Sequence, residues 1–290
     1  MKSLSQYIIE NIVKNEQLIV NEGGNAVKCD RIPSEMGMVI FKEIEQLIRT
    51  NYKGIDMCVL GSVGKKKPGD TNGDIDIAIA VKDRNELQKI VDNLFPDCKQ
   101  SKQTFGISIG YKYDYKGQEK IAQVDFMIED DLDWAAFRYH SPNFINDESL
   151  FKGAVRNQLL SIVIACVPTV EPTEKNEEGM YITRWKHTYN QNGIFKQFLD
   201  YRGKKGLLKT PKKIKELETL ITKNKHELAA FLFHKPDLQD FNSAESIWKA
   251  IHSRNFKYPE LIPHIETRFL DEVLAPEGLP VDVFRDLVSK

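Results

Sequence analysis

The stretch LGSVGKKKPGDTNGDIDIAIAV, residues 60–81, decides both the fold class and the candidate site. Its first residues end a short apolar run that begins at Ile55, and its last eight residues alternate polar and apolar side chains. This pattern predicts two strands joined by a loop. Asp74 and Asp76 are separated by one residue in the second strand, so both carboxylates point to the same face. The isoleucines on the opposite face are predicted to pack into the core.

Acidic residues on these strands predict a metal site. Two carboxylates held this close together repel each other and resist ionisation unless a cation compensates. A third, Asp125, lies in the alternating run IAQVDFMIED, where an unpaired charge is expensive to bury. Asp74, Asp76 and Asp125 together predict ligands for Mg²⁺, which takes oxygen donors and completes its shell with water and substrate phosphates. Two such ions, for which Mn²⁺ can substitute, support in-line displacement at a phosphate.

The loop between the two strands has the composition of a phosphate-binding loop. Gly61 and Ser62 follow the first strand, where glycine lets backbone N–H groups approach a phosphate closely. Lys65 and Lys66 lie within reach of the same anion, and Gly73 precedes the first carboxylate. Taken singly, an Asp-x-Asp pair, a Gly-Ser step or a lone aspartate is more often an ordinary strand edge, exposed loop or salt-bridged group. Their order on the predicted strands favours a site.

The rest of the chain predicts an α+β lobe followed by a mainly helical lobe. Hydrophobic periodicity and turn residues decide each element. We expect helices at 1–20, in a segment starting near Pro33 and Ser34, at 84–94 and at 149–167, and strands at 105–115 and 121–130. Further helices are expected near 190–201, 211–233, 243–254 and 258–274, with a loop at 168–184.

The composition excludes few classes of protein, but it indicates the cellular compartment that we expect. The 41 basic and 42 acidic side chains give a net charge of -1, which says nothing about a polyanionic partner. The cysteines show no metal-binding spacing, which is typical of reduced thiols in a cytosolic protein. No apolar stretch approaches the roughly 20 residues that cross a bilayer, and the N-terminal residues lack the features of a signal peptide. We expect a cytoplasmic protein without a membrane partner.

The motifs LGS at 60–62, DIDI at 74–77 and VDF at 124–126 resemble those of the nucleotidyltransferase superfamily of DNA polymerase beta. Within it the likeness is strongest to the palm of family X DNA polymerases, because RIPSEM at 31–36 is similar to the segment before the first palm helix. The likeness covers about residues 30 to 165.

This resemblance implies a palm with a mixed or antiparallel sheet and flanking helices, in which the three aspartates are catalytic and bind metal. The predicted domains are then an N-terminal helix and Gly-rich loop at 1–30, a nucleotidyltransferase domain at 31–150, and a mainly helical substrate- and nucleic-acid-binding domain at 151–290.

Two stretches after the third carboxylate extend the resemblance. DWAAFRYHSPN is similar to the family's stretch carrying an aromatic pair that packs against the sugar of the incoming nucleotide. Tyr139 matches the first aromatic residue and His140 replaces the second. LFKGAVRNQLL is similar to the following helix, where Lys152 and Arg156 match positions that approach the nascent base pair. The resemblance thus implies nucleotide contacts for the first two residues and nucleic-acid contacts for the other two.

A basic stretch, YRGKKGLLKTPKKIK at 201–215, gathers lysines with few acids. Lys204, Lys205, Lys212 and Lys213 are candidates to neutralise phosphates of a nucleic acid. The alternative is that this stretch forms a solvated linker and an exposed helix face.

These features predict an enzyme that transfers a nucleoside monophosphate from an NTP or dNTP to a hydroxyl, foremost the 3′ end of a nucleic acid, and releases pyrophosphate. The chain departs from the longer polymerases: it shows no helix-hairpin-helix repeat, and its connector between Ser62 and Asp74 is longer and carries lysine where the family has arginine. Other acceptors therefore stay open: a tRNA end, a protein hydroxyl or a small molecule. A catalytically silent nucleic-acid-binding module is the third hypothesis, against which the presence of all three carboxylates argues.

Overall fold

The computed structural model describes residues 26–103, 106–140, 153–204, 206–276, 282 and 285–286. The chain divides into two compact units, with the boundary between Ala136 and Phe137. The boundary predicted near residue 150 and the helix predicted at 1–20 both lie outside the described residues. Within the described part of the chain, no helix is both long and apolar enough to cross a membrane.

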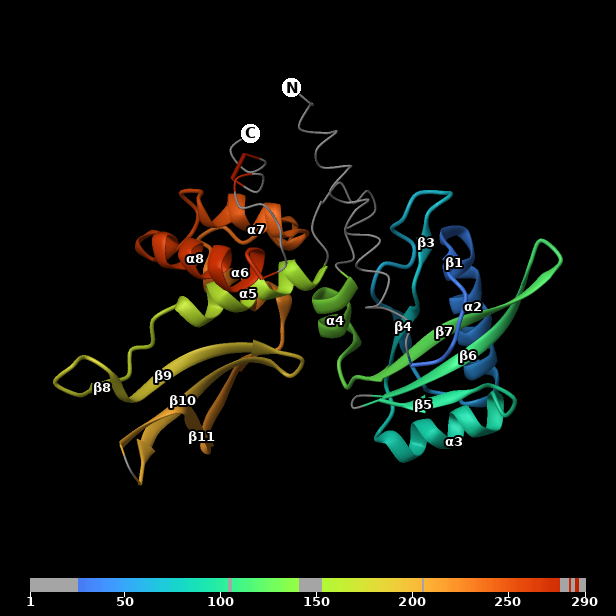
Figure 1. Cartoon of the computed structure of the whole chain (residues 1–290), viewed down its shortest axis with the longest axis horizontal. Helices are drawn as coiled ribbons and strands as arrows, with labels where there is room; N and C mark the ends of the chain where they lie inside the picture. The colour runs from blue at the N-terminus through green and yellow to red at the C-terminus, as the bar shows by residue number, and fades with distance from the viewer. Residues whose placement is uncertain are drawn as a thin grey trace. The chain divides into compact units, whose positions relative to one another are not determined.

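The first unit is built on a mixed sheet (Figure 1). Its elements are β1 (Ile32–Pro33), α2 (Ser34–Asn51), β2 (Met57–Val59), β3 (Thr71–Asn72), β4 (Ile75–Ile79), α3 (Arg84–Leu94), β5 (Gln100–Lys102), β6 (Gly106–Tyr115), β7 (Gln118–Ile128) and α4 (Leu132–Ala135). The order of the five-stranded sheet is β2-β4-β7-β6-β5, in which β4 and β7 are parallel and the other pairs antiparallel. The predicted α+β class and mixed sheet are confirmed.

One face of this sheet is covered by helices α2 and α3. Their apolar stripes pack against the alternate residues of β4 and β7 that point to the same side. The shared core includes Ile40, Ile44, Ile48, Leu87, Ile90, Ile75, Ile77, Val124 and Phe126. Because side chains alternate across a strand, Asp74, Asp76 and Asp125 are left on the opposite face.

The two helices begin in different ways. The side chain of Asp83 caps α3 by accepting hydrogen bonds from the backbone N–H groups of Asn85 and Glu86. Ser34, expected to help start α2, makes no capping hydrogen bond; its hydroxyl donates to the carbonyl oxygen of Lys67 at 2.8 Å. Ser34 therefore ties the start of α2 to the loop that precedes β4.

The second unit contains a four-stranded antiparallel sheet and several short helices (Figure 1). Its elements are η1 (Ala136–His140), which starts at the boundary, α5 (Gly153–Cys166), β8 (Glu174–Lys175), β9 (Tyr181–Asn190), β10 (Gly193–Gly203), β11 (Gly206–Thr222), α6 (Lys225–Leu232), η2 (Leu238–Phe241), α7 (Ala244–Ile251), η3 (Pro259–Leu261), α8 (Ile262–Phe269) and η4 (Leu270–Leu274). The strand order is β11-β10-β9-β8.

The prediction of a mainly helical second lobe is wrong for the segment that forms the four-stranded sheet. The segment expected as a helix at 190–201 lies mainly in β10, and residues 211–222 belong to β11, whereas the end of the helix expected at 211–233 is confirmed by α6. In β10, Ile194, Phe195, Phe198 and Leu199 stand at spacings that fit a helix. Because β10 lies between two strands and bears apolar residues on both faces, it lacks the alternation that marks a half-exposed strand. The helices expected near 243–254 and 258–274 are confirmed by α7 and α8.

Candidate functional site

The three aspartates meet on the open face of the first sheet. Parallel pairing of β4 with β7 places Asp76 directly beside Asp125, and Asp74 lies one residue before the start of β4. One carboxylate oxygen from each residue lies within 4.8 Å of those from the other two. Residues that are about 50 positions apart in the sequence therefore form a single cluster.

The charges of this cluster are poorly compensated within the protein. Burial, together with the nearby carboxylates of Asp74 and Asp125, raises the pKa of Asp76 to about 7. Burial and Asp125 also raise the pKa of Asp74, whereas the positive charges of Arg31 and Lys66 lower it. Three clustered oxygen donors, with raised pKa values at Asp74 and Asp76, fit a divalent cation that prefers oxygen ligands, such as Mg²⁺.

Gly61 lies against the carboxylate of Asp76. Its φ of 64° is in the left-handed region, and a Cβ at this position would be 2.5 Å from Oδ2 of Asp76. The positive φ and the lack of space for a Cβ both favour glycine at this position. The N–H of Leu60 donates to the carbonyl oxygen of Asp76 at 2.8 Å, so the loop leaves β2 directly beside the cluster.

Ser62 is part of a hydrogen-bonded loop. Its hydroxyl donates to Oδ1 of Asn72 at 3.0 Å, and Asn72 is fully buried. The carbonyl oxygen of Ser62 accepts from the backbone N–H of Lys65 at 3.2 Å, which closes a turn. The predicted contact of Ser62 with a phosphate therefore requires its hydroxyl to exchange Asn72 for the ligand.

Two positively charged side chains, Lys66 and Arg31, act on the cluster. Lys66 is exposed, and its ammonium group donates to the carbonyl oxygen of Thr71 at 2.7 Å. Arg31 donates to the hydroxyl of Thr71 at 3.1 Å and to its carbonyl oxygen at 3.3 Å. Arg31 was not among the predicted site residues, although it lies in the RIPSEM segment. The half-buried Gly73 joins β3 to the first carboxylate.

Gln123 was also not among the predicted site residues. It is 3 % exposed, and its amide nitrogen donates to both carboxylate oxygens of Asp125, at 3.1 and 3.0 Å. Its amide oxygen accepts from the backbone N–H of Val27 at 3.2 Å, which fixes the orientation of the amide. The signal in the sequence was the spacing of two between Gln123 and Asp125, which puts both on one face of β7.

A cysteine lies near the same face. Burial raises the pKa of Cys29, a hydrogen bond with the backbone of Gln123 lowers it, and the charges of Asp74, Asp30 and Asp125 raise it. All four cysteines are free thiols, as expected. The thiol of Cys29 is therefore held in its neutral form beside the carboxylates.

The second unit holds the remaining candidates. Arg156 is 4 % exposed and donates to the carbonyl oxygens of Phe241 and Arg138. A nucleic acid cannot reach it in this structure, so the role carried over from the family resemblance is not supported. Tyr139 is half-buried, and the guanidinium carbon of Arg138 lies 4.8 Å from the centre of its ring.

The described lysines of the basic stretch lie on β11 or between β10 and β11. Lys204, Lys212 and Lys213 are exposed, and the latter two belong to a strand instead of the alternative linker or helix face. Lys152, Lys205 and the side chain of His140 lie outside the described residues.

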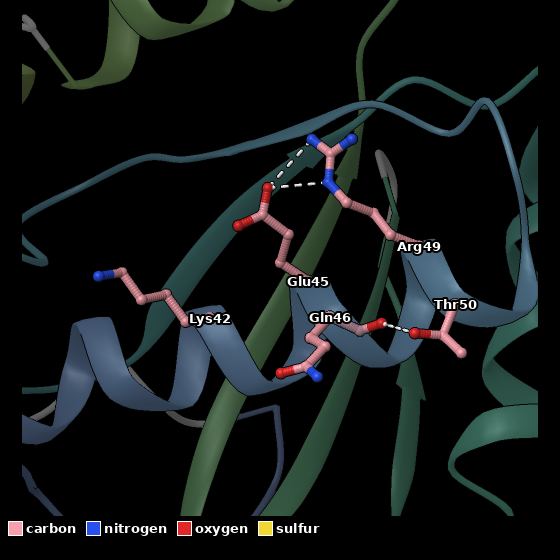
Figure 2. Close-up of a pocket in the computed structure, with 5 residues that line it drawn as sticks. All are labelled: Lys42, Glu45, Gln46, Arg49 and Thr50. Atoms are coloured by element: carbon pink, nitrogen blue, oxygen red, sulfur yellow. Dashed lines mark hydrogen bonds and ion pairs between the residues drawn. The ribbon is translucent and has the colours of Figure 1, made fainter.

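A shallow depression lies on the exposed side of α2, lined by Lys42, Glu45, Gln46, Arg49 and Thr50 (Figure 2). Arg49 pairs with Glu45 at 3.0 Å, and the hydroxyl of Thr50 donates to the carbonyl oxygen of Gln46 at 2.7 Å. These are ordinary contacts one turn apart on a solvated helix. The depression therefore adds no chemistry to the aspartate cluster.

Function has to be inferred from the geometry of the aspartates, Gly61, Ser62 and the basic side chains around them. No protein-family model and no curated protein matches this chain.

Proposed function

We propose that this protein is a metal-dependent nucleotidyltransferase of the DNA polymerase beta superfamily. It transfers a nucleoside monophosphate from an NTP or dNTP to a hydroxyl, foremost the 3′ end of a nucleic acid, and releases pyrophosphate. The observation that carries the proposal is the cluster of Asp74, Asp76 and Asp125, whose carboxylate oxygens lie within 4.8 Å of one another beside a Gly-Ser loop.

The three aspartates would hold Mg²⁺. When bound, the metal activates the attacking hydroxyl and stabilises the charge that develops on the leaving pyrophosphate. Because the pKa of Asp76 is raised to about 7, binding of a cation to the cluster releases a proton near neutral pH. Gln123 holds both oxygens of Asp125 and so limits the orientations of that carboxylate.

The loop after β2 would hold the triphosphate. Gly61 brings the backbone close to Asp76 without a side chain in the way. Lys66 and Arg31 supply positive charge beside Asp74, where a metal–triphosphate complex would bind. Ser62 and Lys65 stand in the turn that follows, within the same loop.

The test is incubation of the full chain with Mg²⁺, each labelled NTP and dNTP, and a panel of DNA, RNA, tRNA and small-molecule acceptors, scored by product size. We expect extension of at least one acceptor by wild type and none above background by Asp76→Ala or Asp76→Asn. Asp97→Asn is the matched control, because Asp97 is exposed and outside the cluster. Equal rates for wild type and Asp76→Asn would overturn the proposal.

The third hypothesis, a silent binding module, predicts a different result. Isothermal calorimetry would then detect no Mg²⁺-dependent binding of any NTP or dNTP, and Asp76→Asn would leave nucleic-acid affinity unchanged. Detection of such binding in wild type and its loss in Asp76→Asn would favour the enzyme.

A further inference from the structure

One face of the second sheet carries basic side chains that the proposed active site does not use. Arg184 and Lys186 stand two residues apart on β9 and therefore point to the same side. Arg184 pairs with Leu199 of β10, which pairs with Lys213 of β11, so these residues form one row across three strands. Arg184, Lys186 and Lys213 together form the β9–β11 basic cluster.

The positive charges of this cluster are not neutralised within the described part of the chain. No described carboxylate forms an ion pair with any of its three residues. One acid whose charge acts on Lys186 is engaged elsewhere: Glu272, which raises the pKa of Lys186, pairs with Arg268 at 2.8 Å.

The pKa of Lys186 reflects the repulsion between these positive charges. Burial lowers its pKa, and the positive charges of Arg184, Arg268 and Lys213 lower it further. Like charges gathered on a partly buried face destabilise the folded protein unless an anion binds there. The cluster is therefore suited to a negatively charged ligand.

Aromatic rings surround Arg184. Its guanidinium carbon lies 4.8 Å from the ring centre of Tyr181 and 5.9 Å from that of Tyr201. Lys175 approaches the same Tyr181 ring at 4.7 Å. The Nε atom of Arg184 is buried and makes no hydrogen bond to any described residue, so ring contacts hold the guanidinium. Basic groups between aromatic rings are typical of surfaces that bind nucleic-acid strands.

The extent of the surface favours a long anion over a single phosphate. Strands are spaced by about 4.8 Å, so Arg184 and Lys213 are separated by roughly 10 Å across β10. β11, which carries Lys213, is the edge strand of the sheet (Figure 1), and the exposed Lys215 stands two residues from Lys213 on the same strand. One phosphate cannot contact the whole of this surface, whereas the backbone of several nucleotides can.

We propose that the β9–β11 basic cluster binds the sugar–phosphate backbone of the nucleic acid that serves as acceptor. The role as acceptor rests on the proposed function. Binding itself requires neither the aspartate cluster nor a metal ion, so the two proposals can fail separately.

The test is fluorescence anisotropy of the full chain with a labelled single-stranded DNA of about 20 nucleotides, in EDTA and without NTP. At about 0.15 M KCl, each phosphate contact strengthens binding roughly fourfold, because log K falls with log salt by about 0.7 per contact. Arg184→Gln/Lys186→Gln should therefore bind about fifteenfold more weakly, and its salt dependence should be shallower by about 1.4.

Two further variants separate binding from folding. Lys235→Gln/Lys249→Gln removes the same charge from exposed positions of the same unit and should leave the salt dependence unchanged. Arg184→Lys/Lys186→Arg keeps the charge and should restore most of the affinity, which a merely structural role would not require.

Two results would overturn the proposal. One is equal affinity and equal salt dependence for Arg184→Gln/Lys186→Gln and the control pair. The other is displacement of the DNA from wild type by a few millimolar inorganic phosphate at constant ionic strength, which would assign a single-anion site. Loss of nucleotidyl transfer with retained DNA binding would contradict only the proposed function.

Discussion

Asp76 is the residue whose protonation should dominate the pH response of the metal-free site. Its pKa is raised to about 7, so between about pH 4 and pH 7 the folded chain keeps a proton that the unfolded chain has lost. Folding stability must then fall as pH rises through this interval. In EDTA, the free energy of unfolding of wild type should fall by about 2 kcal/mol more between pH 5 and pH 8 than that of Asp76→Asn.

Urea denaturation of both proteins at several pH values measures this difference. Saturating Mg²⁺ should remove most of it, because the cation compensates the carboxylates. Parallel pH profiles for wild type and Asp76→Asn in EDTA would contradict the prediction.

Gly61 offers a second test at the residue scale. Gly61→Ala must adopt a positive φ and would also place its Cβ 2.5 Å from Oδ2 of Asp76. We expect a loss of about 1–2 kcal/mol from the backbone alone and a shift of Asp76 that weakens Mg²⁺ binding. Gly54→Ala is the matched control, since Gly54 has a φ of 85° but a Cβ added there would meet nothing within 4 Å. Equal Mg²⁺ affinity in the two variants, measured by calorimetry, would refute the contact.

Gln123 should act through Asp125 without contacting the substrate. Gln123→Leu keeps the approximate size of the side chain but removes the two hydrogen bonds to the carboxylate. Loss of such a supporting contact typically costs about 10- to 100-fold in metal affinity or activity. Gln118→Leu, at an exposed position of the same strand, is the control, and Mg²⁺ titration calorimetry is the readout. Unchanged Mg²⁺ affinity in Gln123→Leu would exclude the positioning role.

At the scale of elements, Arg156 connects α5 to two other segments of the second unit. It donates to carbonyl oxygens of Phe241 in η2 and Arg138 in η1, and its guanidinium carbon lies 4.9 Å from the ring centre of Phe137. Arg156→Ala leaves a cavity and unpaired carbonyl groups, so we expect a loss of about 2–5 kcal/mol in unfolding free energy. Thermal melting measures it; a stable variant with weakened DNA binding would instead support the contact implied by the family resemblance.

The sequence predicted some helices and strands correctly and others incorrectly. α3 has an Asp83 cap, helical periodicity and a clear end, so its predicted and observed bounds coincide at 84–94. β10 and β11 have no such local signals, because β10 is apolar on both faces and β11 is largely exposed. Their pairing with β9 and with each other decides their conformation, and those contacts are invisible to a local pattern.

At the scale of the whole molecule, the two proposed binding sites lie in different units. The aspartate cluster lies entirely in the first unit, and the β9–β11 basic cluster lies entirely in the second. The near-zero net charge of the chain hides both, since acidic and basic groups concentrate in different places. Local geometry, and not total charge, therefore indicates the ligands we propose.

The sequence by itself determined the local features: two strands joined by a Gly-rich loop, the shared face of Asp74 and Asp76, and the helix after them. These depend on side-chain alternation and turn residues within short windows. Tertiary structure decided that Asp125 stands beside Asp76 and that Arg184 and Lys213 share a row. Both arrangements depend on strand register between distant segments, and a shift of one residue would turn the side chains to the other face.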